Sequence, residues 1–306
     1  MLSLSTSWNA IRHQGGIGLI SEIKGLGFES VEINYQVTAE QLSQISQMQR
    51  KGEIKVSSLH NIAPLPEGAD PNTAHRLYPF TSPNSEVRKK AVTLAKQTID
   101  HAVYLEAGAT VLHLGECWEA PLVEMEKSYV NAKLKLHQSK ERIEEIRQKL
   151  IQSRQACSEQ GVGRIVECLS QLVPYAETKG IKLGFENRYW HTQFPMAEEL
   201  GILLQEFKSD RVGMWFDVGH AATQEYFGFQ RKNELLEKYA NRMIGVHLMD
   251  CIRNSDHLAP GKGQYDFANL SKYLRPNTIK VLELALFVTP EEIKAGVAWL
   301  HKQGIS

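Results

Sequence analysis

The sequence predicts a (β/α)8 barrel, an α/β fold in which eight parallel strands close into a cylinder inside a ring of helices. Short apolar runs alternate with amphipathic stretches along the 306 residues, as in a parallel sheet with helical crossovers. Eight such runs occur, which is the number that closes this barrel. An open dinucleotide-binding sheet would need a glycine-rich loop after its first strand, and Gly15-Gly16 comes too late and lacks the spacing. We therefore expect a single TIM-barrel domain over residues 1–306.

The eight predicted strands are short runs of apolar and β-branched residues between turn signals and helical patterns. In chain order they are LSLST (2–6), SVEI (30–33), IKVSSLH (54–60), TVLHL (110–114), IKLGFE (181–186), RVGMWFD (211–217), MIGVHL (243–248) and IKVLEL (279–284). Amphipathic stretches lie between them. In residues 85–108, for example, apolar residues recur at helical spacing between Ser85 as an N-cap and Gly108 as a stop.

Two connections are unusually long. Residues 61–84 are rich in proline and show little periodicity, and a loop of this length in a compact domain commonly covers a site. Residues 116–160, approximately, carry mixed charges, with apolar residues at roughly helical intervals between positions 124 and 155. We expect a helical insertion after the fourth strand, either one long helix or a helical hairpin. It either packs on the barrel, lies over the site or forms the contact of a homo-oligomer.

The charge balance and the apolar pattern argue against several classes of protein. Lys and Arg total 35, as do Asp and Glu, so no net positive field gathers nucleic acid or an anionic membrane. The N-terminus lacks the apolar core of a signal peptide, and no apolar run approaches the ~18 residues of a membrane span. The four cysteines show no close metal-type pair and are expected to be free thiols, which indicates a cytoplasmic protein.

Six predicted strands end in an ionisable residue. Alternate residues of a barrel strand point inward and the others face the helices. If Asp217 points inward, Phe216 packs outward; if His247 points inward, Val246 and Ile244 pack outward. The same phase turns four more strand-end side chains inward, namely His60, His113, Glu186 and Glu283. All six lie at the C-terminal ends of strands, where barrel active sites are built.

The converging side chains predict a metal site. Several carboxylates and imidazoles in one apolar mouth would be very costly to bury without a compensating charge, and a bound cation supplies it. Glu186, Asp217, His247 and Glu283 form a mixed oxygen and nitrogen donor set that suits Mn²⁺, Mg²⁺, Co²⁺ or Zn²⁺. We therefore predict one divalent metal at the C-terminal mouth of the barrel.

Short motifs along nearly the whole chain carry a family resemblance. They are SLHNIAP (58–64), VLHLGE (111–116), LGFENR (183–188), WFDVGHA (215–221), GVHLMD (245–250), DHLAPGKGQYDF (256–267) and VLELA (281–285). In this order and spacing the chain resembles the xylose isomerase-like barrels, the sugar phosphate isomerase/epimerase superfamily that also contains endonuclease IV. For the epimerases the resemblance implies that the four predicted ligands hold one metal and that His220 and Arg253 contact the substrate.

The resemblance implies isomerisation or epimerisation of a ketose, a sugar phosphate or a related cyclitol. A metal on the carbonyl and hydroxyl oxygens stabilises the enediolate that forms when the neighbouring carbon loses a proton. Glu186 and Glu283, on opposite sides of the site, can move that proton, and His220 and Arg253 can polarise the carbonyl. The choice between isomerisation and epimerisation, and between a free and a phosphorylated substrate, stays open. Further expected substrate contacts are His60, His113, His257, Trp8 and Glu32.

The alternative function is an endonuclease IV-like zinc phosphodiesterase that acts on abasic-site DNA. That branch uses three zinc ions, and its ligand pattern resembles His60, His113, Glu186, Asp217, His220, His247, His257 and Glu283. One ligand departs from the pattern, because Ser255 stands two residues before His257 where an Asp is expected. Zero net charge disfavours DNA, so a small carbohydrate is the expected partner. One metal per chain would favour the isomerase, and three would favour the nuclease.

Overall fold

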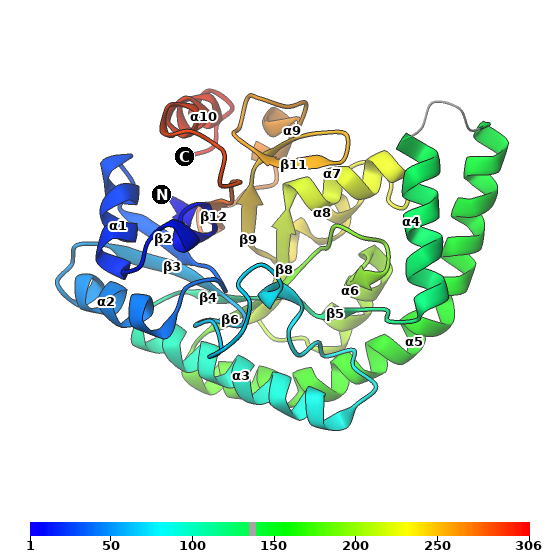
Figure 1. Ribbon diagram of the computed structural model, residues 1–306, viewed down its shortest axis with the longest axis horizontal. Helices are drawn as coiled ribbons and strands as arrows, with labels where there is room; N and C mark the ends of the chain where they lie inside the picture. The colour runs from blue at the N-terminus through cyan, green and yellow to red at the C-terminus, as the bar shows by residue number, and fades with distance from the viewer. Residues whose placement is uncertain (135–138) are drawn as a thin grey trace.

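The structure is a computed structural model that describes residues 1–134 and 139–306. Within these residues eight parallel strands form a closed barrel in the order β1-β12-β9-β8-β6-β4-β3-β2, which confirms the predicted (β/α)8 fold. Figure 1 shows the helices arranged around these strands. The barrel strands are β1 (Leu2–Ser5), β2 (Ser30–Ile33), β3 (Lys55–His60), β4 (Ala109–Leu112), β6 (Lys182–Glu186), β8 (Val212–Asp217), β9 (Met243–Leu248) and β12 (Ile279–Leu282).

The helices begin at capping residues that the sequence supplies. The helix that follows β2 starts at a capping box, in which the side-chain oxygens of Thr38 and Gln41 each accept a hydrogen bond from the other residue's backbone N–H. The predicted helix over 85–108 is capped by Asn84, one residue before Ser85, and ends at Tyr104. The α-helices are α1 (Gly16–Gly25), α2 (Ala39–Arg50), α3 (Ser85–Tyr104), α4 (Ala120–Leu134), α5 (Lys140–Lys179), α6 (Ala197–Glu206), α7 (Val218–Phe227), α8 (Glu234–Tyr239), α9 (Phe267–Ser271) and α10 (Pro290–Lys302).

Two small antiparallel sheets extend the chain beyond barrel strands. One pairs β5 (Gly115–Glu116) with β7 (Gln193–Phe194), which follow β4 and β6. The other pairs β10 (Asp250–Ile252) with β11 (Ser255–Leu258), directly after β9. None of the helices formed by the described residues combines the length and the apolar character that crossing a bilayer requires.

The side chains of the strands follow the predicted alternation with one exception. Phe216 belongs to the apolar layer between the strands and the helices. Ile244 was expected in that layer, and this prediction was wrong. The register between β8 and β9 shifts at this point, so that Met214 pairs with Met243 but Trp215 with Gly245, leaving Ile244 as a bulge. The smaller apolar cluster that fills the barrel interior is Ala109, Val111, Trp215, Ile244 and Val281.

The insertion after β4 is a helical hairpin in which α4 packs against α5, and Figure 1 shows this pair at one edge of the molecule. Positions 135–138 of the predicted insertion lie outside the described residues. The predicted boundary near residue 160 does not coincide with a helix end, because α5 continues to Lys179, where it packs on α3 and leads into β6. Gly161 does not break this helix. It allows a close approach to Phe194, whose ring lies where a side chain at position 161 would be.

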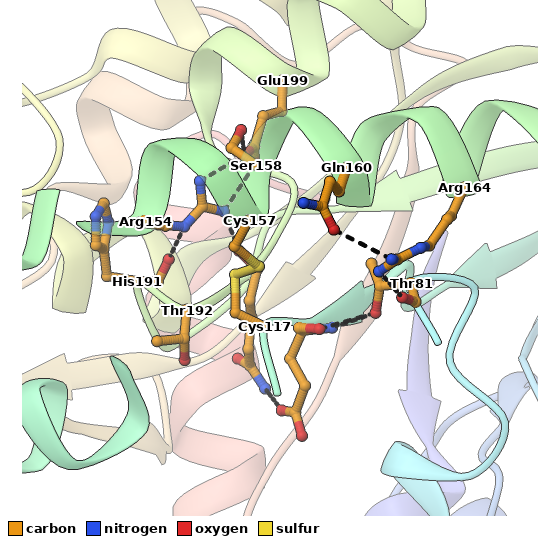
Figure 2. Close-up of a disulfide and its surroundings, with 12 residues drawn as sticks. Thr81, Cys117, Arg154, Cys157, Ser158, Gln160, Arg164, His191, Thr192 and Glu199 are labelled. Carbon is orange, nitrogen blue, oxygen red and sulfur yellow. Dashed lines mark hydrogen bonds and ion pairs between the residues drawn. A yellow bond between two sulfur atoms is a disulfide. The ribbon is translucent and has the colours of Figure 1, made fainter. Parts of the chain in front are cut away.

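Cys117 and Cys157 form a disulfide bond, with their Cα atoms 6.1 Å apart, that ties the residue after β5 to α5 (Figure 2). The prediction of free thiols was wrong for this pair. The two residues are 40 positions apart and meet only because α5 folds back along α4, so their spacing gave no signal. Cys168 and Cys251 are free and buried. The inference of a cytoplasmic location from four free thiols therefore loses its support.

Candidate active site

The four predicted metal ligands meet at the C-terminal mouth of the barrel. Glu186 ends β6, Asp217 ends β8, His247 lies in β9 and Glu283 directly follows β12. These four strands are neighbours in the barrel, and Asp217 and His247 are paired in register. One ligand atom of each side chain lies within 4.8 Å of the others, and all four side chains are buried. The fold therefore brings together the donor set that strand alternation predicted.

His247 directs one ring nitrogen into this cluster and the other away from it. Its Nδ1 lies 2.8 Å from Glu186 Oε1, 3.0 Å from Glu283 Oε2 and 3.5 Å from Asp217 Oδ2. Its Nε2 lies 3.1 Å from Glu32 Oε1. A neutral imidazole that donates Nε2–H to Glu32 presents its Nδ1 lone pair to the cluster, which is how a carboxylate orients a metal-binding histidine.

Glu32 contacts the ring nitrogen of His247 that points away from the cluster. It is fully buried, and its two carboxylate oxygens accept hydrogen bonds from Ser5 Oγ (3.1 Å) and Ser58 Oγ (2.8 Å). Burial opposes its ionisation, but the nearby charge of His247 holds the pKa of this carboxyl below its usual value. Glu32 was predicted as a substrate contact. The structure instead places it against His247, away from the wall of the cavity described below.

The cluster has the chemistry of a divalent cation site. Asp217 Oδ2 is buried and has no hydrogen-bond partner among the described residues. Three carboxylates and one imidazole form a donor set that suits Mn²⁺, Mg²⁺, Co²⁺ or Zn²⁺. Burial alone would lower the pKa of His247, but the Glu283 and Glu32 carboxylates raise it well above its usual value, and burial raises the pKa of Glu283. His247 therefore carries a proton that a bound cation would displace.

Glu186 also belongs to a second group. Its Oε2 lies 2.5 Å from His113 Nε2 and 3.6 Å from His60 Nε2, and ligand atoms of the three residues converge within 4.8 Å. Arg188 enters the same group: its Nη1 lies 2.7 Å from Glu186 Oε2 and also hydrogen-bonds His113 Nε2. Burial and the charge of Arg188 hold the pKa of His113 well below its usual value, so this imidazole is neutral and accepts the bond.

A cavity of about 240 Å³ opens above these two groups. His220 lies on its wall with Nδ1 2.9 Å from the Asn187 carbonyl, which makes Nδ1 the donor of this hydrogen bond. Burial lowers the pKa of His257, but Asp256, 3.1 Å away, raises it to about 9, so His257 is a cation at neutral pH. The predicted site residues on the cavity wall are His60, His113, Glu186, His220, His257 and Glu283.

Two further predicted substrate contacts lie elsewhere. Trp8 is fully buried in the apolar core, where its Nε1 donates to the Val288 carbonyl at 2.8 Å. Arg253 is exposed in the turn between β10 and β11 and lines a different cavity together with Asp266 and Tyr226. The structure does not bring either residue to the cavity above the metal ligands.

Several residues on the cavity wall were not predicted from the sequence. Arg188 follows Glu186 by two positions, so the alternation that turned Glu186 inward could have indicated it as well. His75 comes from the proline-rich connection 61–84, and its presence shows that this loop does reach the site. Tyr35 also lines the wall, from the loop after β2, where strand alternation no longer applies.

Comparison with known proteins identifies relatives over most of the chain. The family model described as xylose isomerase-like TIM barrel matches residues 20–303. The uncharacterized protein MJ1311 of Methanocaldococcus jannaschii is 26% identical over 200 residues, which are 63% of this chain and 55% of that protein. An inosose dehydratase of Clostridium perfringens is 29% identical over 131 residues, 37% of this chain and 42% of that enzyme. The chain spans about half the length of these two relatives.

Among solved structures, that of a D-tagatose 3-epimerase-like protein has a TM-score of 0.69 and 18% identity, covering 99% of this chain and 96% of the other. At this identity the likeness shows the fold alone. The family model covers far more than half of the sequence and includes all four candidate metal ligands. The chain therefore belongs to the xylose isomerase-like TIM barrel family.

Proposed function

We propose that the protein is a divalent-metal-dependent isomerase or epimerase of a ketose, a sugar phosphate or a related cyclitol. The observation that carries the proposal is the placement of Glu186 and Glu283 at 2.8 and 3.0 Å from the same nitrogen of His247, on strands that flank β8 and β9. The cavity above them, about 240 Å³, is smaller than the ~300–1,000 Å³ of sites for drug-sized ligands and suits one small sugar. The similarity to an inosose dehydratase supports this substrate class.

The reaction needs a proton to leave and return at a carbon next to a carbonyl. A divalent cation held by Glu186, Asp217, His247 and Glu283 would stabilise the negative charge of the enediolate oxygens. Either glutamate can accept the proton, and the other can return one from the opposite side, which inverts that carbon. Return to the adjacent carbon from one side would instead move the carbonyl. The cationic His257 can hold a substrate oxygen at the cavity wall.

The test is proton exchange in D₂O with a panel of ketoses and ketose phosphates. Metal-loaded wild-type protein should place deuterium at the carbon next to the carbonyl of an accepted substrate. Glu186→Gln and Glu283→Gln keep the side-chain shape and one ligand oxygen but remove the base. They should cost about 10²–10⁴ in rate, the usual contribution of general acid–base catalysis. Metal content is measured on every variant, so that loss of the base is separated from loss of the cation.

A zinc phosphodiesterase is the second candidate, and one observation favours it. His60, His113 and Glu186 converge as a second ligand group beside the first. Against it, Arg188 places a guanidinium on Glu186 and His113, where a second ion would need those atoms. Elemental analysis separates the two: one metal per chain supports the isomerase and three support the nuclease. Nicking of abasic-site DNA with zinc, together with no exchange of any ketose, would replace the first proposal with the second.

A further inference from the structure

A second and larger cavity lies beside the first, between α4 and the β5–β7 sheet. Its volume is about 450 Å³. Trp190 lines both cavities, so they meet at this side chain. The other walls come from Trp118, directly after Cys117, and from the face of α4 that carries Val123, Lys127 and Asn131. The insertion after β4 therefore supplies one wall of a cavity that is adjacent to the candidate active site.

Hydrogen-bonded polar side chains lie between the two cavities. Glu116 Oε2 accepts from Arg76 Nη2 at 3.0 Å and from Gln193 Nε2 at 3.5 Å. Gln193 Oε1 in turn accepts from the backbone N–H of Trp190 at 3.0 Å. A pocket of about 20 Å³, enough for about one water molecule, lies among these groups. A substrate that crosses this point meets groups able to donate to and accept from hydroxyls.

The second cavity is held open by covalent and buried polar ties (Figure 2). The Cys117–Cys157 disulfide fixes the segment before Trp118 to α5. Arg154 of α5 is buried, pairs with Glu199 at 2.5 Å, and donates to the His191 and Gln193 carbonyls. From α4, Glu126 accepts from the backbone N–H of His191 at 2.6 Å. The two walls are therefore fixed relative to each other, which lowers the ordering cost of binding.

The lining indicates a neutral, amphipathic ligand. Trp118 is 47% exposed, although a large indole is normally covered, and it offers a flat apolar surface at the cavity. The nearby cations are already paired: Arg76 with Glu116 at 3.0 Å, and Lys127 with Glu124 at 2.8 Å. A phosphate would compete with a carboxylate at each of these cations. A sugar ring has an apolar C–H face for an indole and hydroxyls for the paired polar groups, so it fits this lining better.

We propose that the second cavity binds a second sugar ring, so that the substrate is a ketose or related keto-sugar that carries a glycosyl substituent. This inference rests on the proposed function, because it places the reacting ring in the 240 Å³ cavity. The glycosyl ring then passes Trp190 and lies against Trp118 and α4.

The experiment compares D-fructose with glycosyl fructoses that differ in linkage: turanose, maltulose, lactulose and isomaltulose. Binding to metal-loaded protein is measured by calorimetry, and deuterium uptake is measured in parallel. At least one glycosyl fructose should bind about tenfold tighter than fructose, equivalent to ~1.4 kcal/mol. Trp118→Ala and the cavity-filling Val123→Trp should remove this gain and leave fructose binding unchanged. Trp299→Ala is the matched control, since Trp299 on α10 is similarly exposed, at 42%, and should retain the gain.

Each outcome decides between the two proposals. Equal binding of fructose and all glycosyl fructoses, or a gain that survives both cavity variants, overturns the second-ring inference. If the gain is present and is lost in the variants, but no sugar takes up deuterium, the inference stands and the proposed reaction fails. If fructose takes up deuterium and binds as tightly as its glycosides, the reaction stands and the inference fails. Absence of any sugar binding overturns both.

Discussion

Breaking the Cys117–Cys157 bond should cost the protein about 4 kcal/mol of unfolding free energy. The bond closes a loop of 40 residues that spans α4 and the first half of α5. For a loop of this length, chain entropy lost by the unfolded state is ~13 cal/mol/K, or about 4 kcal/mol at 25 °C. In the folded state Arg154 and Glu126 hold the same segments together, so the native fold should persist without the bond.

Denaturant unfolding of wild-type protein and Cys157→Ser, each with and without reductant, measures this value. The oxidised wild type should unfold at a clearly higher denaturant concentration than the other three samples. Its melting temperature should be higher by on the order of 10 °C. The reductant should not affect Cys157→Ser, which controls for any other action of the reagent. Thiol titration of the unfolded, unreduced wild type should detect Cys168 and Cys251 alone.

Two results would refute the reasoning. If four thiols titrate in the unreduced protein, the disulfide is not formed and the stability argument has no basis. If the bond is present but the wild type and Cys157→Ser unfold at the same midpoint, the loop is already constrained in the unfolded chain.

Three further predictions concern the site. Glu32→Gln should weaken metal binding about 10- to 100-fold, because Glu32 orients His247. The control is Ser3→Ala, which removes a buried Ser3–Ser30 hydrogen bond on the same inner face and should bind metal as the wild type does. Metal binding at pH 7 should release protons, since the carboxylates raise the pKa of His247 well above its usual value, and the affinity for the metal should fall as pH is lowered. Calorimetry in buffers of different ionisation enthalpy measures this release, and detection of none would contradict the prediction. Burial lowers the pKa of His75 to about 4, so the neutral side chain stabilises the fold above the unfolded pKa of ~6.5, and this contribution is lost as pH falls toward 4. The unfolding free energy of the wild type should therefore fall relative to that of His75→Gln between these two pH values. A constant difference between the two proteins would exclude the shift.

The barrel could be predicted because the alternation of residues in each strand shows which side chains pack against the helices. Runs such as 212–217 are apolar on the side that faces the helices and end in an ionisable residue on the inner side. The number of such runs indicated the fold, and their alternation indicated which side chains point inward. The bulge at Ile244 could not be predicted, because it arises from the pairing of β9 with β8 rather than from either strand alone. The extent of α5 was missed for a similar reason. Gly161 signals a helix break, but Phe194, from a distant segment, gives that glycine a packing role.

In the candidate site, too, strand alternation predicts the direction of some side chains and not of others. Glu186, Asp217, His247 and Glu283 sit on strands whose direction alternation fixes, and the structure brings them together. Arg253 lies in a turn, where no strand alternation constrains the direction of its side chain. The family resemblance supplied a role for that position, but here the turn between β10 and β11 points the residue to another cavity.

Arg188 bears on the choice between the two candidate reactions. Hydrolysis of a phosphodiester by several metal ions needs each ion to be bound and each ligand group to be free for it. In this chain one oxygen of Glu186 faces His247 in the cation cluster, and the other accepts from Arg188 and lies beside His113. The second group thus already has a fixed positive charge that needs no ion. That charge also lies beside a carboxylate proposed to accept a proton, where it favours the ionised form of that carboxylate. The proposed single-cation site, with a permanent guanidinium on the opposite oxygen of Glu186, suits proton transfer at carbon better than phosphodiester hydrolysis.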